Sequence, residues 1–210
     1  MNKSPLVALC LTLILISPSK ADPGADPPPL PENKTILLSL PKSAFDRTTE
    51  GISRRELDTL AVNLESDNWK VIDSKQGQLT IECKHPSSLL RIYAYSMGPD
   101  TALLTHVINE RATFSETWIH KTSNRTTIRK PLLPEVSIND FYSKDDKVAD
   151  PANYRGNVIL EVKDDGTLVY GVYAGMNKNL DGKPVAYAVA AFWDGNRFKL
   201  SKKPLQPSNH

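Results

Sequence analysis

Residues 69–121 read WKVIDSKQGQLTIECKHPSSLLRIYAYSMGPDTALLTHVINERATFSETWIHK, and the pattern in this stretch decides the expected fold. Short segments rich in β-branched and aromatic residues alternate between apolar and polar positions, which is typical of β-strands. Turn-forming residues separate them, and connections this short favour antiparallel neighbours. The stretch therefore predicts an antiparallel meander of five strands: residues 69–73, 78–84, 89–95, 101–108 and 114–121.

Immediately upstream, the sequence predicts one amphipathic helix. Ser53 and Glu56 have the spacing of a capping box, in which each side chain satisfies a main-chain N–H near the other residue. We expect the helix to end near Glu65 and to pack on one face of the sheet. Its apolar stripe consists of residues that recur at helical spacing: Leu57, Leu60, Ala61 and Leu64.

Downstream of a polar bridge, four further strands are predicted. Residues 164–166 (DDG) and 194–196 (DGN) are tight-turn sequences, because Gly and Asn adopt positive φ at low cost. Residues 185–193 are apolar throughout, which is typical of a central strand covered on both faces. The predicted strands are residues 157–162, 167–174, 185–193 and 197–200.

These elements together predict the fold class. We expect an α+β protein in which one N-terminal amphipathic helix packs on a predominantly antiparallel β-sheet, arranged as a meander. Residues 36–205 would form a single α+β domain, with two sub-lobes at 36–130 and 131–205. Residues 22–35 precede it as a Pro-rich flexible leader, because a segment with so many prolines and so few large apolar residues cannot bury enough surface to order itself.

Residues 1–21 are expected to be a secretory signal peptide. Lys3 supplies a positive charge, residues 6–16 form an apolar run, and Ser19 and Ala21 are small residues three and one before a cut. The alternative is an uncleaved membrane anchor, but the run spans about 11 residues, roughly half of what a helix needs to cross the hydrocarbon core. The expected product is secreted or periplasmic, with no membrane span after cleavage.

The charge of this product argues against nucleic acid as a partner. Removal of residues 1–21 takes away Lys3 and Lys20 but no acid, so the 26 basic residues fall to the same number as the 24 acidic ones. Attraction to nucleic acid depends on an excess of clustered Lys and Arg. We therefore expect no nucleic-acid binding, and an unknown extracytoplasmic protein or a glycan as the partner.

Several short stretches spread over most of the expected product resemble uncharacterised exported bacterial proteins. They are residues 48–53 (TTEGIS) with Glu56 and Leu57, 66–69 (SDNW), 133–141 (LPEVSINDF) and 192–198 (FWDGNRF). The resemblance implies a secreted α+β domain. It brings no activity, cofactor or catalytic residue.

No sequence motif indicates a known catalytic chemistry. A nucleophile elbow and a phosphate-binding glycine loop are both absent from the sequence, so we assign no catalytic residue and no cofactor. Residues 177–182 (NKNLDG) alternate oxygen side chains as a calcium loop does, but Ala188 stands where that loop needs an acid. A hairpin turn is favoured there, and no metal site is expected. Cys83 is in phase with Leu79 and Ile81, which favours a buried thiol over a nucleophile.

Two histidines leave a question open. His106 and His120 lie on neighbouring predicted strands, where a hydrogen-bonded or surface histidine is the ordinary interpretation. If those strands pair as a hairpin, the two side chains can also approach each other and form part of an assembled site.

The candidate binding residues are Arg91, Tyr93 and Tyr95. They alternate along one predicted strand with residues that are apolar, so the three share a face. If the apolar residues point inward, the arginine and tyrosines form an outward patch suited to a protein or sugar partner. Alternatively, the tyrosines cover a neighbouring loop or a second sheet.

The sequence therefore favours an exported binding or protein-interaction module without recognisable catalytic machinery. An extracellular hydrolase with a site assembled from distant segments is one alternative, and a structural envelope component is another. Whether the protein is an enzyme is left open, with the balance against it.

Overall fold

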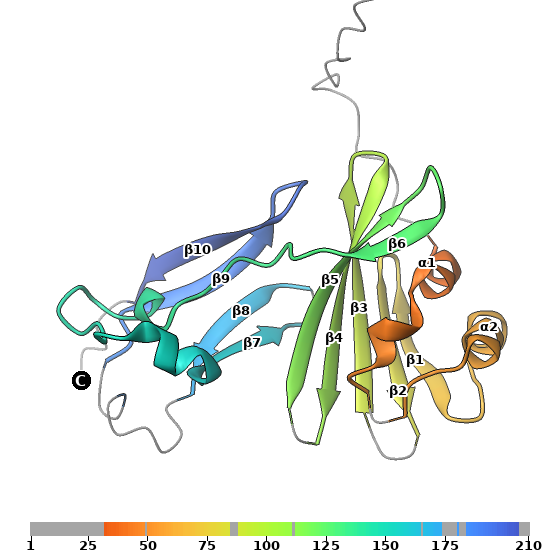
Figure 1. The fold of residues 1–210 in the computed structure, drawn as a ribbon, viewed down its shortest axis with the longest axis horizontal. Coiled ribbons are helices and arrows are strands. Elements are labelled where there is room, and N and C mark those ends of the chain that lie inside the picture. Colours follow the sequence, from red (N-terminus) through yellow and green to blue (C-terminus); the bar gives the residue numbers. More distant parts are fainter. Residues whose placement is uncertain are drawn as a thin grey trace, which may run out of the picture.

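The chain folds into two antiparallel sheets that lie against each other (Figure 1). The structure, a computed structural model, describes residues 32–48, 50–84, 88–110, 112–164, 166–173, 180 and 184–205. Sheet A has the strand order β1-β2-β3-β4-β5-β6 and sheet B the order β10-β9-β8-β7. The strands of sheet A are β1 (Trp69–Lys75), β2 (Gln78–Cys83), β3 (Ser88–Met97), β4 (Asp100–Asn109), β5 (Thr113–Lys121) and β6 (Thr126–Arg129). Those of sheet B are β7 (Val158–Val162), β8 (Leu168–Val172), β9 (Tyr187–Trp193) and β10 (Phe198–Pro204).

Short helices complete the fold. The α-helices are α1 (Asn33–Ser39) and α2 (Arg54–Asn63), and the 3-10 helices are η1 (Lys42–Phe45), η2 (Ile138–Asp140) and η3 (Pro151–Asn157). The N-terminal helices α1, η1 and α2 cover one face of sheet A. In the described part of the chain, every helix is too short or too polar to span a bilayer.

The predicted fold class, α+β with one helix as the main partner of a single sheet, is wrong. The described chain is mostly antiparallel β, with ten strands in two sheets and only short helices. The sequence pattern located most strands correctly, and the predicted antiparallel arrangement is confirmed. The error arose because the strands after residue 157 form a second sheet, which covers the face of sheet A that the helices leave open.

The predicted helix is present as α2, and its start is the one expected. The Ser53 side chain accepts a hydrogen bond from the Glu56 main-chain N–H at 3.1 Å. The Glu56 carboxylate is used differently from a capping box, because it accepts from the Asn68 side chain at 3.0 Å and so ties α2 to the start of β1. Leu64 ends the helix in the left-handed conformation, with φ of 61°.

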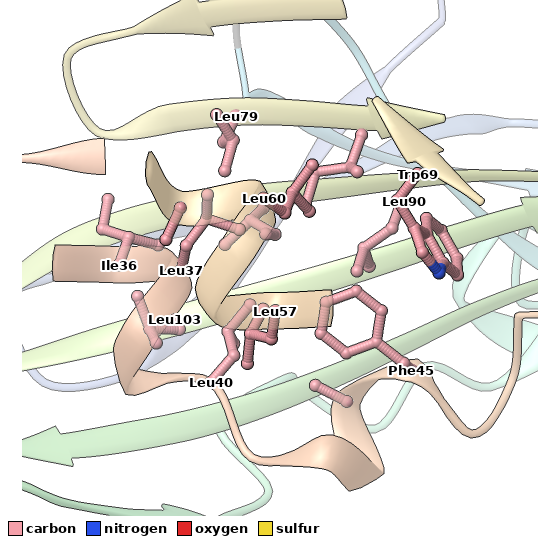
Figure 2. Packing of buried hydrophobic residues seen from close by; sticks show 14 of the residues in the cluster. Ile36, Leu37, Leu40, Phe45, Leu57, Leu60, Trp69, Leu79, Leu90 and Leu103 are labelled. Carbon is pink, nitrogen blue, oxygen red and sulfur yellow. The ribbon is translucent and has the colours of Figure 1, made fainter. Parts of the chain in front are cut away.

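Two hydrophobic clusters lie on the two faces of sheet A. On one face, leucines of α1 and α2 pack with Phe45 and Trp69 against apolar residues of the central strands (Figure 2). The Phe45 and Trp69 rings meet edge to face at 5.5 Å between centroids. On the other face, Tyr93, Leu104 and Ile119 belong to a second cluster with the inner face of sheet B. Sheet A is therefore the middle layer of the molecule.

Strand β9 differs from its sequence-based prediction. It lies inside sheet B, as expected, and Val189 and Ala191 on its inner face are buried. Phe192 and Ala188 on its outer face are exposed, so the prediction of cover on both faces is wrong. The apolar run reflects a sheet face that no described residue covers.

We predict that Leu60→Ala lowers the free energy of unfolding by about 2–5 kcal/mol, because Leu60 is fully buried in the first cluster and its removal leaves a cavity. Val62→Ala on the same helix is the control. Its side chain is 67% exposed, so its effect should stay within about 0.5 kcal/mol. Chemical denaturation monitored by tryptophan fluorescence measures both. Equal effects of the two substitutions would contradict the packing of α2 on sheet A.

Candidate functional site

Three alternate side chains of β3 bind the end of β7 and the turn that joins it to β8. The Arg91 guanidinium donates to the Val162 carbonyl at 3.3 Å, and the Tyr93 hydroxyl donates to the Lys163 carbonyl at 3.2 Å. The Tyr95 hydroxyl donates to the Gly166 carbonyl at 3.3 Å. Successive residues on one face of β3 thus contact successive parts of the turn.

Strand β3 continues across the end of sheet B from β7 towards β10. The Tyr95 ring lies 5.4 Å from the Trp193 ring of β9 and 5.0 Å from the Phe198 ring of β10, measured between centroids. The Trp193 indole N–H donates to the Ser96 carbonyl at 2.9 Å. The strands of the two sheets therefore cross, as Figure 1 shows, and β3 is the strand on which sheet B rests.

The turn needs a glycine where it passes over Tyr93. Gly166 has φ of +82°, a conformation that L side chains rarely adopt. A Cβ at this position would also lie 3.2 Å from Cδ1 of the Tyr93 ring. Both constraints keep the turn close to β3.

A groove of about 240 Å³ lies beside this contact, over strands β1 to β3. We call it the β1–β3 groove. Arg91 and Tyr93 line it together with Asp164, which comes from the β7–β8 turn. The remaining lining residues come from the first three strands: Ile72, Asp73, Lys75, Gln78, Leu79, Thr80, Leu89 and Ile92. The side chains of Leu79 and Ile92 are buried in the cluster on the opposite face of sheet A, so these two do not present side chains to the groove.

The electrostatics of the groove centre on Arg91. Its side chain is 25% exposed and pairs with the Asp164 carboxylate at 3.1 Å, whereas the Asp164 side chain is 88% exposed. The hydrogen bond to Val162 fixes the guanidinium from the protein side. An exposed ion pair contributes at most about 1 kcal/mol, so the Asp164 carboxylate is easily replaced at Arg91 by one from another molecule.

His106 lies next to Arg91 on the same face of sheet A, under sheet B. It is buried, and its Nδ1 is 2.7 Å from the Ser115 hydroxyl. Burial lowers the pKa of His106 to about 4, and the positive charge of Arg91 acts in the same direction, while Glu161 opposes it. The imidazole is therefore neutral near neutral pH.

His106 and His120, for which the sequence allowed a shared site, do not approach each other. The register pairs His106 with Ser115 and His120 with Thr101, five positions apart along β4. His106 faces sheet B, whereas His120 contacts Thr127, which donates to Ser39 at the end of α1. The two imidazoles thus lie on opposite faces of sheet A.

The other sequence predictions have mixed outcomes. Cys83 is buried, as expected. The calcium-loop candidate at residues 177–182 lies outside the described residues, apart from Leu180. Within the described ranges, no group of three or more His, Cys, Asp or Glu side chains is placed to hold a metal ion.

Of the three predicted binding residues, Arg91 and Tyr93 line the groove and Tyr95 lies between the sheets. All three bind the end of β7 or the turn after it. The tyrosines therefore contact a second sheet, which is the alternative given in the sequence analysis. Sequence reasoning missed Asp164, Gln78 and Thr80 as lining residues. The alternation in residues 78–84 places Gln78 and Thr80 on one face of their strand, but their alignment with Arg91 and Tyr93 depends on the β2–β3 register.

Comparison with known proteins adds no relative. No protein-family model, no curated protein and no solved structure matches the chain. The site is therefore interpreted from its geometry alone.

We predict that Gly166→Ala destabilises the fold by about 1 kcal/mol or more, because it places a Cβ at positive φ and against Tyr93. Gly171→Ala in the adjacent strand is the matched control. A Cβ there meets nothing within 4 Å, and Gly171 has no positive φ. Urea titration of both variants measures the difference. Equal stabilities would contradict the close approach of the turn to β3.

We also predict that His106 makes stability depend on pH. The unfolded chain binds a proton at this histidine near pH 6.5 and the folded chain only near pH 4, so acid favours unfolding in this window. The contribution is complete above about pH 6.5 and falls by up to about 3 kcal/mol as the pH drops towards 4.

Unfolding free energies measured across this range in the wild type and in His106→Gln isolate the effect. The variant should lose the histidine-dependent part of the slope, because glutamine does not titrate. A wild type and a variant with identical slopes would show that His106 is not shielded from water.

Proposed function

We propose that the protein is an exported binding module that recognises a partner protein through the β1–β3 groove. In this proposal it is secreted or periplasmic and acts without catalytic machinery of its own. The observation that carries the proposal is the groove itself, in which Arg91 is held by Val162 from one side and faces a replaceable carboxylate on the other.

The composition of the groove supports a protein partner over a glycan. The aliphatic side chains of Ile72 and Leu89 lie near the charged pairs Lys75–Asp73 and Arg91–Asp164. Apolar contacts bordered by polar groups are typical of protein interfaces. Sugar rings are commonly bound on exposed aromatic faces, but Tyr93, the aromatic residue among the described lining residues, is only 4% exposed.

The rigidity of the groove also favours binding. Its floor consists of paired strands β1 to β3, and its far wall is the turn held by Tyr93 and Tyr95. Side chains fixed in this way lose little conformational freedom when a partner binds, which lowers the cost of association.

Affinity capture from the native extracytoplasmic fraction tests the proposal, with Thr80→Trp as the blocking variant. Thr80 lines the groove, so a tryptophan there fills it. Thr126→Trp is the matched control, because Thr126 is exposed on the edge strand β6 and lies outside the groove. We expect a protein that is retained by the wild type and by Thr126→Trp but not by Thr80→Trp.

Two outcomes would contradict the proposal. One is a partner retained equally by all three proteins, which would place binding elsewhere. The other is a fraction in which the wild type retains nothing beyond the blocking variant. Thermal unfolding of each variant checks that the tryptophan leaves the fold intact.

A further inference from the structure

Strand β7 is an edge of sheet B, and one side of its main chain has no neighbouring strand. The Tyr173 N–H donates to the Asn157 carbonyl and the Lys163 N–H to the Thr167 carbonyl, at 2.8 and 2.9 Å. Bonded positions alternate along an antiparallel pair, so Ile159 and Glu161 also bond to β8. The main-chain groups of the positions between them point away from the sheet: Val158, Leu160 and Val162.

Some of these outward groups already have partners within the protein. The Val158 N–H donates to the Arg155 carbonyl at the end of η3, and the Val162 carbonyl accepts from Arg91. The Val158 and Leu160 carbonyls accept no hydrogen bond from the described residues, and the Leu160 and Val162 N–H groups donate none to them. Val162 is only 2% exposed, so the groups open to an added strand are the Val158 carbonyl and the two main-chain groups of Leu160.

The other sheet edges carry features that discourage strand addition, whereas β7, although only five residues long, has no lysine, proline or register shift. Proteins protect edges with lysines, prolines, bulges or short strands. Strand β1 has a register shift between Val71 and Asp73, and β6 is only four residues long. Strand β10 carries Lys199, Lys202, Lys203 and Pro204. Strand β7 reads VILEV, and Ile159 is 41% exposed.

Sheet A provides a floor beside this edge. Arg91 bonds Val162, so the row of sheet A that contains Arg91 lies at the β7 edge. This row consists of Thr80, Arg91, His106 and Ser115. Strand β3 begins further out, and Figure 1 shows sheet A extending past β7. The next row on the same face therefore lies beyond the edge, and we call it the floor row: Glu82, Leu89, Ile108 and Thr113.

We propose that an extended segment of a partner protein adds to β7 as a fifth strand of sheet B and lies on the floor row. Its main chain would pair with the Val158 carbonyl and with both main-chain groups of Leu160. Its inward side chains would pack on Leu89 and Ile108, which are half-buried in the absence of a partner. This proposal rests on the proposed function, because the floor row meets the β1–β3 groove at Leu89.

The position of sheet A limits what can occupy this place. A second copy that paired its β7 with this β7 would turn its inner face to the same side, because the twofold axis of an antiparallel pair stands perpendicular to the sheet. Its own sheet A would then collide with the sheet A already beneath the edge. A single extended segment adds only about 5 Å to the width of sheet B and avoids this collision.

The floor row also indicates the sequence of the segment. Two side chains that point inward, with one residue between them in the segment, should be apolar so that they pack on Leu89 and Ile108. The position next to Glu82 should be basic, because an opposite charge there is favourable and an acid is not. The expected ligand is therefore a short extended segment with alternate apolar residues and a lysine or arginine at one end.

A synthetic peptide with alternating valine and threonine between terminal lysines serves as the probe. Titration of the labelled full-length protein, followed by NMR, should give saturable shifts of the Leu160 and Val162 amides and of the Leu89 and Ile108 methyl groups. The same peptide with N-methyl groups on alternate residues cannot pair its main chain. It should bind at least about tenfold more weakly.

Variants of the protein complete the test. Leu160→Pro removes the central outward N–H and should weaken binding by at least about tenfold. Lys202→Pro is the control on the opposite edge, where the Phe198 N–H points outward to Leu132. It should leave peptide binding unchanged. The N-methylated peptide needs no substitution, so the test remains decisive if Leu160→Pro fails to fold.

The contradicting outcomes separate this inference from the proposed function. Equal binding of both peptides, blocked by Thr80→Trp, would overturn strand addition and leave the groove as the binding site. Absence of saturable shifts at β7 would also overturn strand addition. A dimer in sedimentation experiments that dissociates in Leu160→Pro would show that a second copy occupies the edge, contrary to the proposal. Retention of the native partner by Thr80→Trp as strongly as by the wild type would instead contradict the proposed function.

Discussion

The three hydrogen bonds from β3 to the β7–β8 turn are the constraint on which the rest of the structure depends. They run from Arg91 to the last carbonyl of β7, and from Tyr93 and Tyr95 to the main chain of the turn. Individually such bonds stabilise a fold by about 1 kcal/mol, so most of the stability of the junction comes from the apolar cluster between the sheets. The bonds determine where sheet B sits and in which direction its strands cross sheet A.

That position creates both proposed binding surfaces. Because the turn ends over β3, Asp164 closes one side of the β1–β3 groove, and sheet A extends beyond β7. Arg91 belongs to both surfaces, since it lines the groove and bonds the last carbonyl of the β7 edge. A ligand that displaces Asp164 from Arg91 would therefore meet the end of the open edge.

Interactions between residues close in the sequence could be predicted, and interactions between residues far apart in the sequence could not. Helix α2 was predictable because Ser53 and Glu56 interact within one turn, and β1 to β5 were predictable from alternation. Alternation also placed Arg91 on one face with two tyrosines. It could not predict what covers them, because the main chain that they bind lies about 70 positions further along the sequence. The fold class failed for this reason. The prediction that β9 is covered on both faces failed at Phe192, because the sequence does not distinguish an apolar residue on a covered face from one on an exposed face.

The packing of sheet B across β3 is tested most directly by measuring, in solution, whether the Tyr95 ring lies close to Trp193 and Phe198. Nuclear Overhauser effects between these side chains are expected, since the centroids lie 5.4 and 5.0 Å from that of Tyr95. Such effects would show that sheet B rests across β3. Their absence in a sample whose sheets each give dispersed, folded spectra would show that the sheets are not joined in this way, and the groove and the open edge would lose their basis together.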